Sequence, residues 1–210
     1  MGYEAQIAGI GDVIPGRRIF QRVIRSVQKR STAEIAERRA EAVRVVRELA
    51  DLEFVNGGGT GSIERTVAEN AVTEVAAGSG LFGPHLFDHY RHFHPAPAAS
   101  FALSVVRRPD AETATLLGGG WIASGPTGPD RQPEIAWPEG LSMVAREMAG
   151  EVQSPLTGAA TESMSVGDRV WLRHTKAGEL SEHLNEFALV DGDTVIGSLP
   201  TYRGNGKAFL

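Results

Sequence analysis

The sequence predicts an α/β domain followed by an all-β domain, and two observations support this prediction. Up to residue 80, stretches with apolar residues at helical spacing alternate with short apolar runs that end in glycine, as in a parallel sheet. From about residue 100, short strand-like runs are separated by glycine and proline turns. We therefore expect a first domain over residues 1–97 and a second domain over residues 98–210.

The composition excludes several classes of protein. The chain has 210 residues, of which 41% are hydrophobic and 22% charged, and its formal net charge is -5. This charge argues against nucleic acid as a main partner. The absence of cysteine excludes disulfides, thiolate catalysis and cysteine metal sites. Because no apolar run reaches membrane-spanning length and no signal-peptide pattern is present, we expect no membrane partner and a cytoplasmic location.

The first 50 residues predict two helices after an irregular start. Residues 2–11 look like the outgoing end of a strand and its loop, as though the chain began midway through a domain. Residues 17–29 carry apolar side chains at helical spacing. The sequence Ser31-Thr32-Ala33-Glu34 is a capping box, which predicts that a second helix begins there.

Residues 52–62 predict a strand that turns sharply into a helix. The short apolar run of residues 52–55 is followed by Asn-Gly-Gly-Gly-Thr-Gly-Ser over residues 56–62. The glycines permit positive φ and expose backbone N–H groups, and Ser62 is a plausible N-cap for a helix over residues 63–70. Such a place favours a phosphate. A tight turn without a ligand is the alternative, since neither the P-loop lysine nor the G-x-G-x-x-G spacing is present.

A second junction of the same kind follows after one short helix. Residues 72–80, Val-Thr-Glu-Val-Ala-Ala-Gly-Ser-Gly, again run from a strand into a glycine turn. Barrels of the (β/α) type use N–H-rich turns after their last two strands to hold a phosphate. The two junctions together predict a phosphate site.

The second domain is expected to consist of short strands. The Asp191-Gly192-Asp193 sequence is a hairpin turn signal, and the Pro- and Gly-rich residues 125–138 predict a surface loop. The strands are expected at residues 101–106, 114–117, 121–124, 169–173, 187–190 and 194–199.

Two groups of histidines stand out. His85, His89 and His92 have the spacing of one helical face, which predicts either a helix packed at the domain junction or, less favoured, a zinc site. His174 and His183 delimit the part of the chain that is densest in titratable groups. Histidine is suited to proton transfer near neutral pH, although a polar loop between strands is an equal alternative.

Four segments resemble one family of enzymes. They are residues 56–62, residues 73–80, the opening Gly2-Tyr3-Glu4-Ala5-Gln6 and the tail Leu199-Pro200-Thr201-Tyr202-Arg203-Gly204. Together they resemble the D-threonine aldolase and D-serine dehydratase-like family, and most closely its bacterial amino acid deaminase/aldolase branch. The resemblance implies the last strands of an alanine-racemase-type (β/α) barrel, which carries pyridoxal 5'-phosphate, followed by a D-serine-dehydratase-like β domain.

The resemblance covers only the C-terminal half of such an enzyme. A complete (β/α) barrel takes about 250 residues, so the first domain has room for only its last strands. In the family the Schiff-base lysine lies near the first barrel strand, and none of Lys29, Lys176 and Lys207 corresponds to it. We expect the C-terminal portion of a pyridoxal-phosphate-dependent amino acid lyase or deaminase. The alternative is an inactive remnant or a phosphate-binding module that lacks the lysine.

The resemblance also implies roles for individual residues. Arg203 could pair with a substrate carboxylate, although a solvated loop arginine is an equal alternative. Glu182-His183 is similar to a Glu-His pair near the active site of related dehydratases. The catalytic candidates are His174, His183 and Arg203. The residues implied to bind the cofactor are Tyr3, Gly58, Gly59, Thr60, Gly78 and Ser79.

Metal-dependent members of the family have metal ligands where this chain has Tyr202 and Gly204, so no metal site is expected there. The implied substrate is a small molecule, an amino acid. The implied protein partner is either the missing N-terminal half as a separate chain or a second copy in a homodimer.

Overall fold

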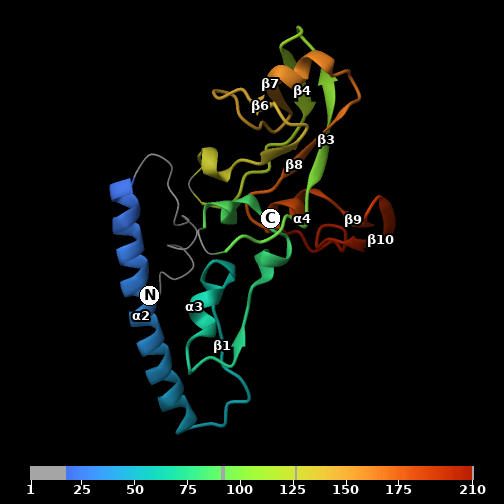
Figure 1. Cartoon of the computed structure of the whole chain (residues 1–210). Coiled ribbons are helices and arrows are strands. Elements are labelled where there is room, and N and C mark those ends of the chain that lie inside the picture. Colours follow the sequence, from blue (N-terminus) through green and yellow to red (C-terminus); the bar gives the residue numbers. More distant parts are fainter. Residues whose placement is uncertain (1–17, 91–92, 126, 210) are drawn as a thin grey trace. The chain divides into compact units, whose positions relative to one another are not determined.

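The computed structural model describes residues 18–90, 93–125 and 127–209 (Figure 1). The chain divides into two compact units, Met1–Ala98 and Ala99–Leu210. The opening motif with Tyr3 lies outside the described residues. No helix among the described residues is long and apolar enough to cross a membrane.

The first unit begins its described part with one long helix, α2 (Arg18–Arg47). The prediction of two helices with a capping box at Ser31 was wrong. Neither proline nor glycine interrupts this segment, so the helix continues through it. Within the helix the Thr32 hydroxyl donates to the Gln28 carbonyl oxygen at 2.8 Å, one turn back.

Two short parallel strands follow, β1 (Asn56–Gly57) and β2 (Glu74–Val75). Between them lie the short helices η1 (Thr60–Ser62) and α3 (Ile63–Val67), and β2 leads into η2 (Gly78–Leu81). An ion pair between Arg39 of α2 and Glu69 joins the long helix to the segment after α3. The Glu69 side chain is 7% exposed, so this pair lies largely out of water.

The first unit ends its regular structure with a 3₁₀ helix, η3 (His85–His89), which follows Pro84. A helix is present here as predicted, but it is a short 3₁₀ helix that ends before Tyr90 and so does not extend to the third histidine. Phe87, Tyr90 and Phe93 pack against each other beside it. His85 is buried, whereas His92 and the side chain of His89 lie outside the described residues.

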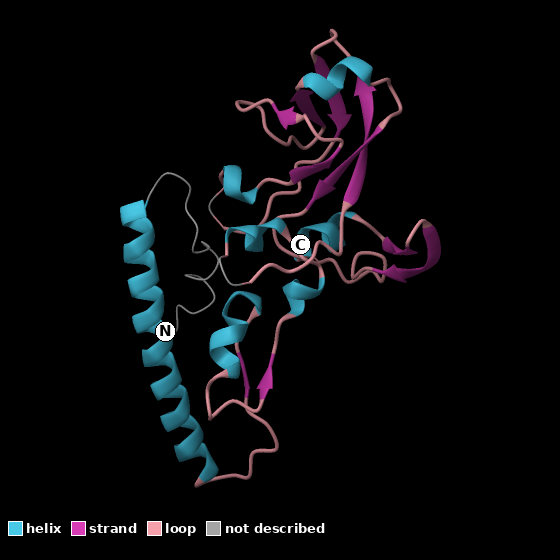
Figure 2. Ribbon diagram, viewed as in Figure 1, coloured by secondary structure: helices cyan, strands magenta, loops and turns pink. Residues whose placement is uncertain are grey.

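The second unit contains a six-stranded antiparallel sheet with the strand order β5-β8-β3-β4-β7-β6. Strands are drawn in magenta in Figure 2. The strands β9 and β10 form a separate antiparallel hairpin around Gly192. The sheet strands are β3 (Phe101–Arg107), β4 (Thr113–Leu117), β5 (Glu134–Trp137), β6 (Ser142–Met143), β7 (Gln153–Thr157) and β8 (Arg169–Arg173). The hairpin strands are β9 (Glu186–Asp191) and β10 (Thr194–Pro200).

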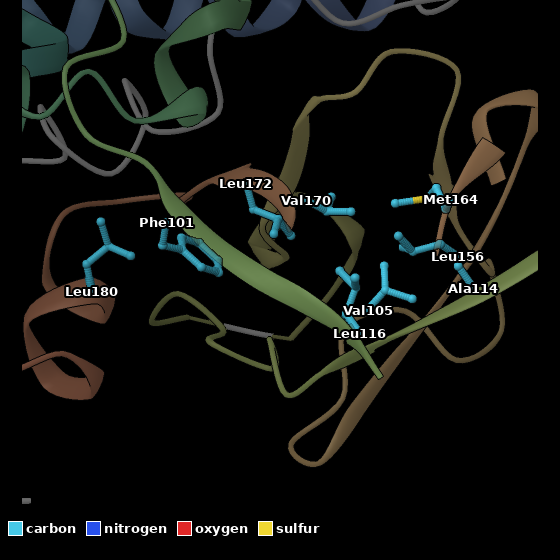
Figure 3. Packing of buried hydrophobic residues seen from close by; sticks show 9 residues of the cluster. All are labelled: Phe101, Val105, Ala114, Leu116, Leu156, Met164, Val170, Leu172 and Leu180. Carbon is cyan, nitrogen blue, oxygen red and sulfur yellow. The ribbon is translucent and has the colours of Figure 1, made fainter. Parts of the chain in front are cut away.

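One hydrophobic core holds this sheet together (Figure 3). Its side chains come from β3, β4, β7 and β8, with Met164 and Leu180 added from outside the sheet. Leu116, Leu156 and Leu172 have no exposed surface. Alternate residues of each strand point to one face, so a few short strands supply a dense cluster.

Five of the predicted strands are confirmed, and each observed end lies within one residue of the predicted end. They are the strands predicted at residues 101–106, 114–117, 169–173, 187–190 and 194–199. Two other predictions were wrong. Residues 121–124 form no strand, and the expected loop at residues 125–138 contains β5. Strand β7 was missed because it contains Pro155, and proline normally argues against a strand between two neighbours.

Candidate functional site

The two glycine junctions lie side by side because β1 and β2 pair in parallel and end at the same edge. At this edge the N–H of Ala76, the residue after β2, donates to the carbonyl oxygen of Gly57, the last residue of β1, at 3.2 Å. Beyond this contact the segment after β1 turns into η1, and the segment after β2 turns into η2. Parallel pairing thus brings two glycine-rich turns to one place, although they are separated along the sequence by α3.

Thr60 joins the two turns directly. Its Oγ1 accepts hydrogen bonds from the Ser79 hydroxyl at 2.7 Å and from the Gly80 N–H at 2.9 Å. The Thr60 side chain is buried. A threonine hydroxyl has one proton and two lone pairs, so accepting two hydrogen bonds leaves its own proton for a further acceptor.

The glycines of the two turns differ in whether the surrounding protein requires a glycine at that position. Gly58 has φ +91, and a Cβ there would lie 2.9 Å from the Thr66 hydroxyl oxygen, so the protein itself requires glycine. Gly59 has φ -179, which any residue adopts, and a Cβ on it would meet nothing within 4 Å. Gly78 likewise has open space at its Cβ position. Packing within the described structure therefore does not explain Gly59 or Gly78.

The backbone of the two turns offers hydrogen-bond donors. In the part of the chain that the structure describes, the N–H groups of Gly59, Thr60, Gly61, Gly78 and Ser79 donate to no backbone carbonyl. Successive N–H groups in a turn form a concave surface that suits an anion. The structure thus brings Gly59, Thr60, Gly78 and Ser79 together around open, donor-rich backbone.

The predicted N-cap position of Ser62 is confirmed, but its side chain makes no capping hydrogen bond. Its hydroxyl instead donates to the Gly59 carbonyl oxygen at 3.3 Å. The helix also ends at Val67, three residues earlier than expected. Any attraction for an anion at this place therefore comes from the turns and the Thr60 hydroxyl.

The catalytic candidates lie in the second unit, and they have different environments. His174 follows β8 and is completely buried. His183 is the last residue of α4 (Gly178–His183) and is exposed, with its ring stacked on Trp121 at a centroid distance of 4.9 Å and an interplanar angle of 8°. Trp121 in turn stacks on Phe101 at 4.3 Å. The structure therefore places His183, and not His174, at the protein surface.

Arg203 is held against α4. Its Nη1 donates to the Glu182 carbonyl oxygen at 3.2 Å, and its backbone N–H donates to the Ser181 carbonyl oxygen at 3.4 Å. Since Glu182 precedes His183, these bonds keep Arg203 on the segment that carries the exposed imidazole. The structure brings His183 and Arg203 together, although they are far apart in the sequence.

Tyr202 anchors the same segment, a role that no local sequence pattern predicts. Its hydroxyl donates to the Gly178 carbonyl oxygen at 2.6 Å, so the tail is tied to the first residue of α4. Partial burial raises the pKa of this phenol above its usual value, and the carboxylates of Glu182 and Glu179 raise it further. Trp121 was also missed, because a stack between segments so distant in sequence has no local signal.

Alkaline pH is expected to loosen the attachment of the tail. A group whose pKa is raised on folding stabilises the fold below its unfolded pKa and loses that contribution as pH rises through the folded pKa. We therefore expect stability to fall at pH above the ordinary tyrosine range of about 10, because ionised Tyr202 no longer donates to Gly178. Denaturant unfolding across this pH range measures the effect. Tyr202→Phe should flatten it, and an unchanged slope in this variant would contradict the assignment.

Within residues 18–90, 93–125 and 127–209, no three or more His, Asp or Glu side chains lie close enough to hold a metal ion. The Gly204 N–H donates to the Thr201 hydroxyl oxygen at 3.1 Å. This bond belongs to a series of turns over residues 201–207.

Solved structures of two enzymes resemble this fold. One is D-threonine aldolase from Filomicrobium marinum, with a TM-score of 0.72 and 17% sequence identity over 86% of this chain and 50% of that chain. The other is D-threo-3-hydroxyaspartate dehydratase in a metal-free form, with a TM-score of 0.58 and 18% identity over 82% of this chain and 51% of that chain. No protein-family model matches the sequence, and no curated protein matches it either.

These similarities confirm the predicted fold class, which is part of an alanine-racemase-type (β/α) barrel followed by a β domain. The chain spans about half the length of each of the two structures.

Proposed function

We propose that this chain is the C-terminal portion of a pyridoxal-phosphate-dependent lyase or deaminase that acts on an amino acid. The observation that carries the proposal is the Thr60 hydroxyl, which bridges the turns after two neighbouring parallel strands. The fold shared with an aldolase and a dehydratase supports it. The sequence motifs that resemble the D-threonine aldolase and D-serine dehydratase-like family include both turns.

The residues at the two turns fit the phosphate of this cofactor. A phosphate accepts hydrogen bonds and carries negative charge, and the turns offer free N–H groups and a hydroxyl proton. The open space at Gly59 and Gly78 is space that a Cβ would fill. Thr60, Ser79 and the backbone of Gly59 and Gly78 would hold the phosphate. When bound, the cofactor supplies an electron sink for breaking a bond at the α-carbon of an amino acid.

In the second unit, His183 and Arg203 are the groups proposed to meet the substrate. The planar guanidinium of Arg203 suits a carboxylate, which every amino acid substrate carries. The His183 ring is exposed and oriented by its stack on Trp121, so one of its nitrogens could accept or return a proton at the substrate. Tyr202 and the two backbone contacts of Arg203 keep this pair on one rigid segment.

Gly59→Ala tests the phosphate site without disturbing the fold. Because a Cβ at Gly59 meets no protein atom within 4 Å, the free energy of unfolding should stay within about 0.5 kcal/mol of wild type. The methyl group would intrude on the phosphate, so cofactor affinity should fall, as measured by titration calorimetry with pyridoxal 5'-phosphate.

Gly58→Ala is the matched control. It places the same methyl group one residue earlier, where φ is +91 and Thr66 is in the way, so it should lower stability. Unchanged cofactor affinity in Gly59→Ala would contradict the proposed site.

A phosphate-binding module without catalysis is the second candidate function. Its supporting observation is that the turns of the first unit form the proposed phosphate site by themselves, while Lys29 and Lys207 are both exposed on the surface. Such a module would bind pyridoxal 5'-phosphate and release it unchanged. Addition of an amino acid would then leave the cofactor absorbance spectrum as it was.

A further inference from the structure

Lys176 has surroundings unlike those of the other two lysines. It follows the end of β8, next to the residues that lead into β5, the strand that pairs with β8. Its Nζ donates to the Ser124 carbonyl oxygen at 2.7 Å and to the Ser124 hydroxyl oxygen at 2.9 Å. Its backbone N–H donates at 2.6 Å to the carboxylate of Glu179, a residue that is itself buried. The Lys176 side chain is therefore fixed in place at both ends.

The surroundings of Lys176 lower the pKa of its amine, mainly through burial. Partial burial lowers its pKa, and the nearby positive charge of Arg131 lowers it further, while the carboxylates of Glu179 and Asp130 act in the opposite direction. A neutral lysine amine has two hydrogens and one lone pair. Because both hydrogens can be directed to Ser124, the lone pair is left to react with an electrophile.

Arg131 offers an anion-binding group that lies close enough for its charge to act on this amine. Its side chain is 16% exposed, and its Nε and Nη1 are buried without a hydrogen-bond partner. The nearest carboxylate, that of Asp130, is 3.7 Å from Nη1 and is itself mostly exposed. A guanidinium with unused donors has capacity for a carboxylate or phosphate.

We propose that Lys176 forms an imine with the aldehyde group of a small anionic molecule, whose anion pairs with Arg131. The Nζ lone pair attacks the carbonyl carbon and forms the C–N bond, and the carbonyl oxygen takes up a proton. The resulting hydroxyl group then leaves as water while the C=N bond forms and the nitrogen loses both of its original protons. The Ser124 hydroxyl, in contact with Nζ, is placed to relay a proton. The step consumes no oxidant or reductant.

This inference concerns the second unit alone and does not depend on the phosphate site of the first. The test uses glyoxylate as the anionic aldehyde and acetaldehyde as the neutral one, with cyanoborohydride to reduce the imine on the folded full-length chain. Peptide mass spectrometry then reports how fast each lysine is labelled. We expect glyoxylate to label Lys176 before Lys29 and Lys207, and to be preferred over acetaldehyde at Lys176 alone.

Two variants separate the roles of the amine and the anion-binding group. Lys176→Arg should abolish the labelling at this position and leave the labelling of Lys29 and Lys207 unchanged. Arg131→Gln should slow the labelling of Lys176 by glyoxylate about tenfold and so remove the preference for glyoxylate over acetaldehyde. This factor corresponds to the free energy of one hydrogen bond to a charged group. Circular dichroism of each variant verifies that the fold is retained. Equal labelling of all three lysines in the folded wild type, or equal rates with the two aldehydes at Lys176, would overturn the proposal.

Discussion

Thr60→Val is expected to weaken the binding of pyridoxal 5'-phosphate by about 10- to 100-fold. Valine has nearly the shape of threonine but cannot accept the hydrogen bonds of Ser79 and the Gly80 N–H, nor donate one to the phosphate. A hydrogen bond to a charged group contributes about 1.5 to 3 kcal/mol, which sets the range. Titration calorimetry on the full-length chain measures the change.

Thr60→Ser is the matched control, since it keeps the hydroxyl and removes only a methyl group. It should bind the cofactor with nearly wild-type affinity. If Thr60→Val bound the cofactor as tightly as Thr60→Ser, the bridging hydroxyl would be a structural link between the turns and no part of a ligand site.

Gly204→Ala is expected to destabilise the second unit by about 1 to 3 kcal/mol. A Cβ at this position would lie 2.0 Å from the Asn185 carbonyl oxygen, so backbone has to move. The Thr201 N–H donates to that same carbonyl oxygen at 2.9 Å, and the movement would therefore disturb the turn that holds Arg203 against α4. Chemical denaturation measures the loss.

Gly197→Ala in β10 serves as the comparison for Gly204→Ala. Its Cβ would meet only the Leu189 side chain at 3.9 Å, an ordinary contact. This variant should not be destabilised. Equal stability of the two variants would show that the tail adjusts freely to a side chain at residue 204.

The phosphate site could be predicted from the sequence because its signals are local. Each turn has its own glycines, and each follows its own apolar run. Their meeting could also be expected, since successive parallel strands end at the same edge of a sheet. The hydrogen bond between Thr60 and Ser79 depends on the register of the two strands, which the sequence pattern does not determine.

The second unit shows where sequence patterns stop being informative. His174 and His183 belong to one polar stretch, yet His174 is buried, whereas His183 is exposed and its ring stacks on Trp121. Burial of a polar residue depends on contacts from strands distant in sequence, and no local pattern reports those. The capping box at Ser31 failed for a related reason, because local capping signals are outweighed where residues on both sides favour a helix.

The proposed phosphate site predicts a difference between two ligands of the full-length chain, pyridoxal 5'-phosphate and pyridoxal, which lacks the phosphate. Titration calorimetry with each ligand measures this difference. A site built from the Thr60 hydroxyl and the N–H groups of two glycine turns predicts that the phosphorylated molecule binds at least about tenfold more tightly. It also predicts that inorganic phosphate competes with it. Equal affinity for the two molecules, or no binding of either, would contradict the proposal that these turns hold the cofactor phosphate.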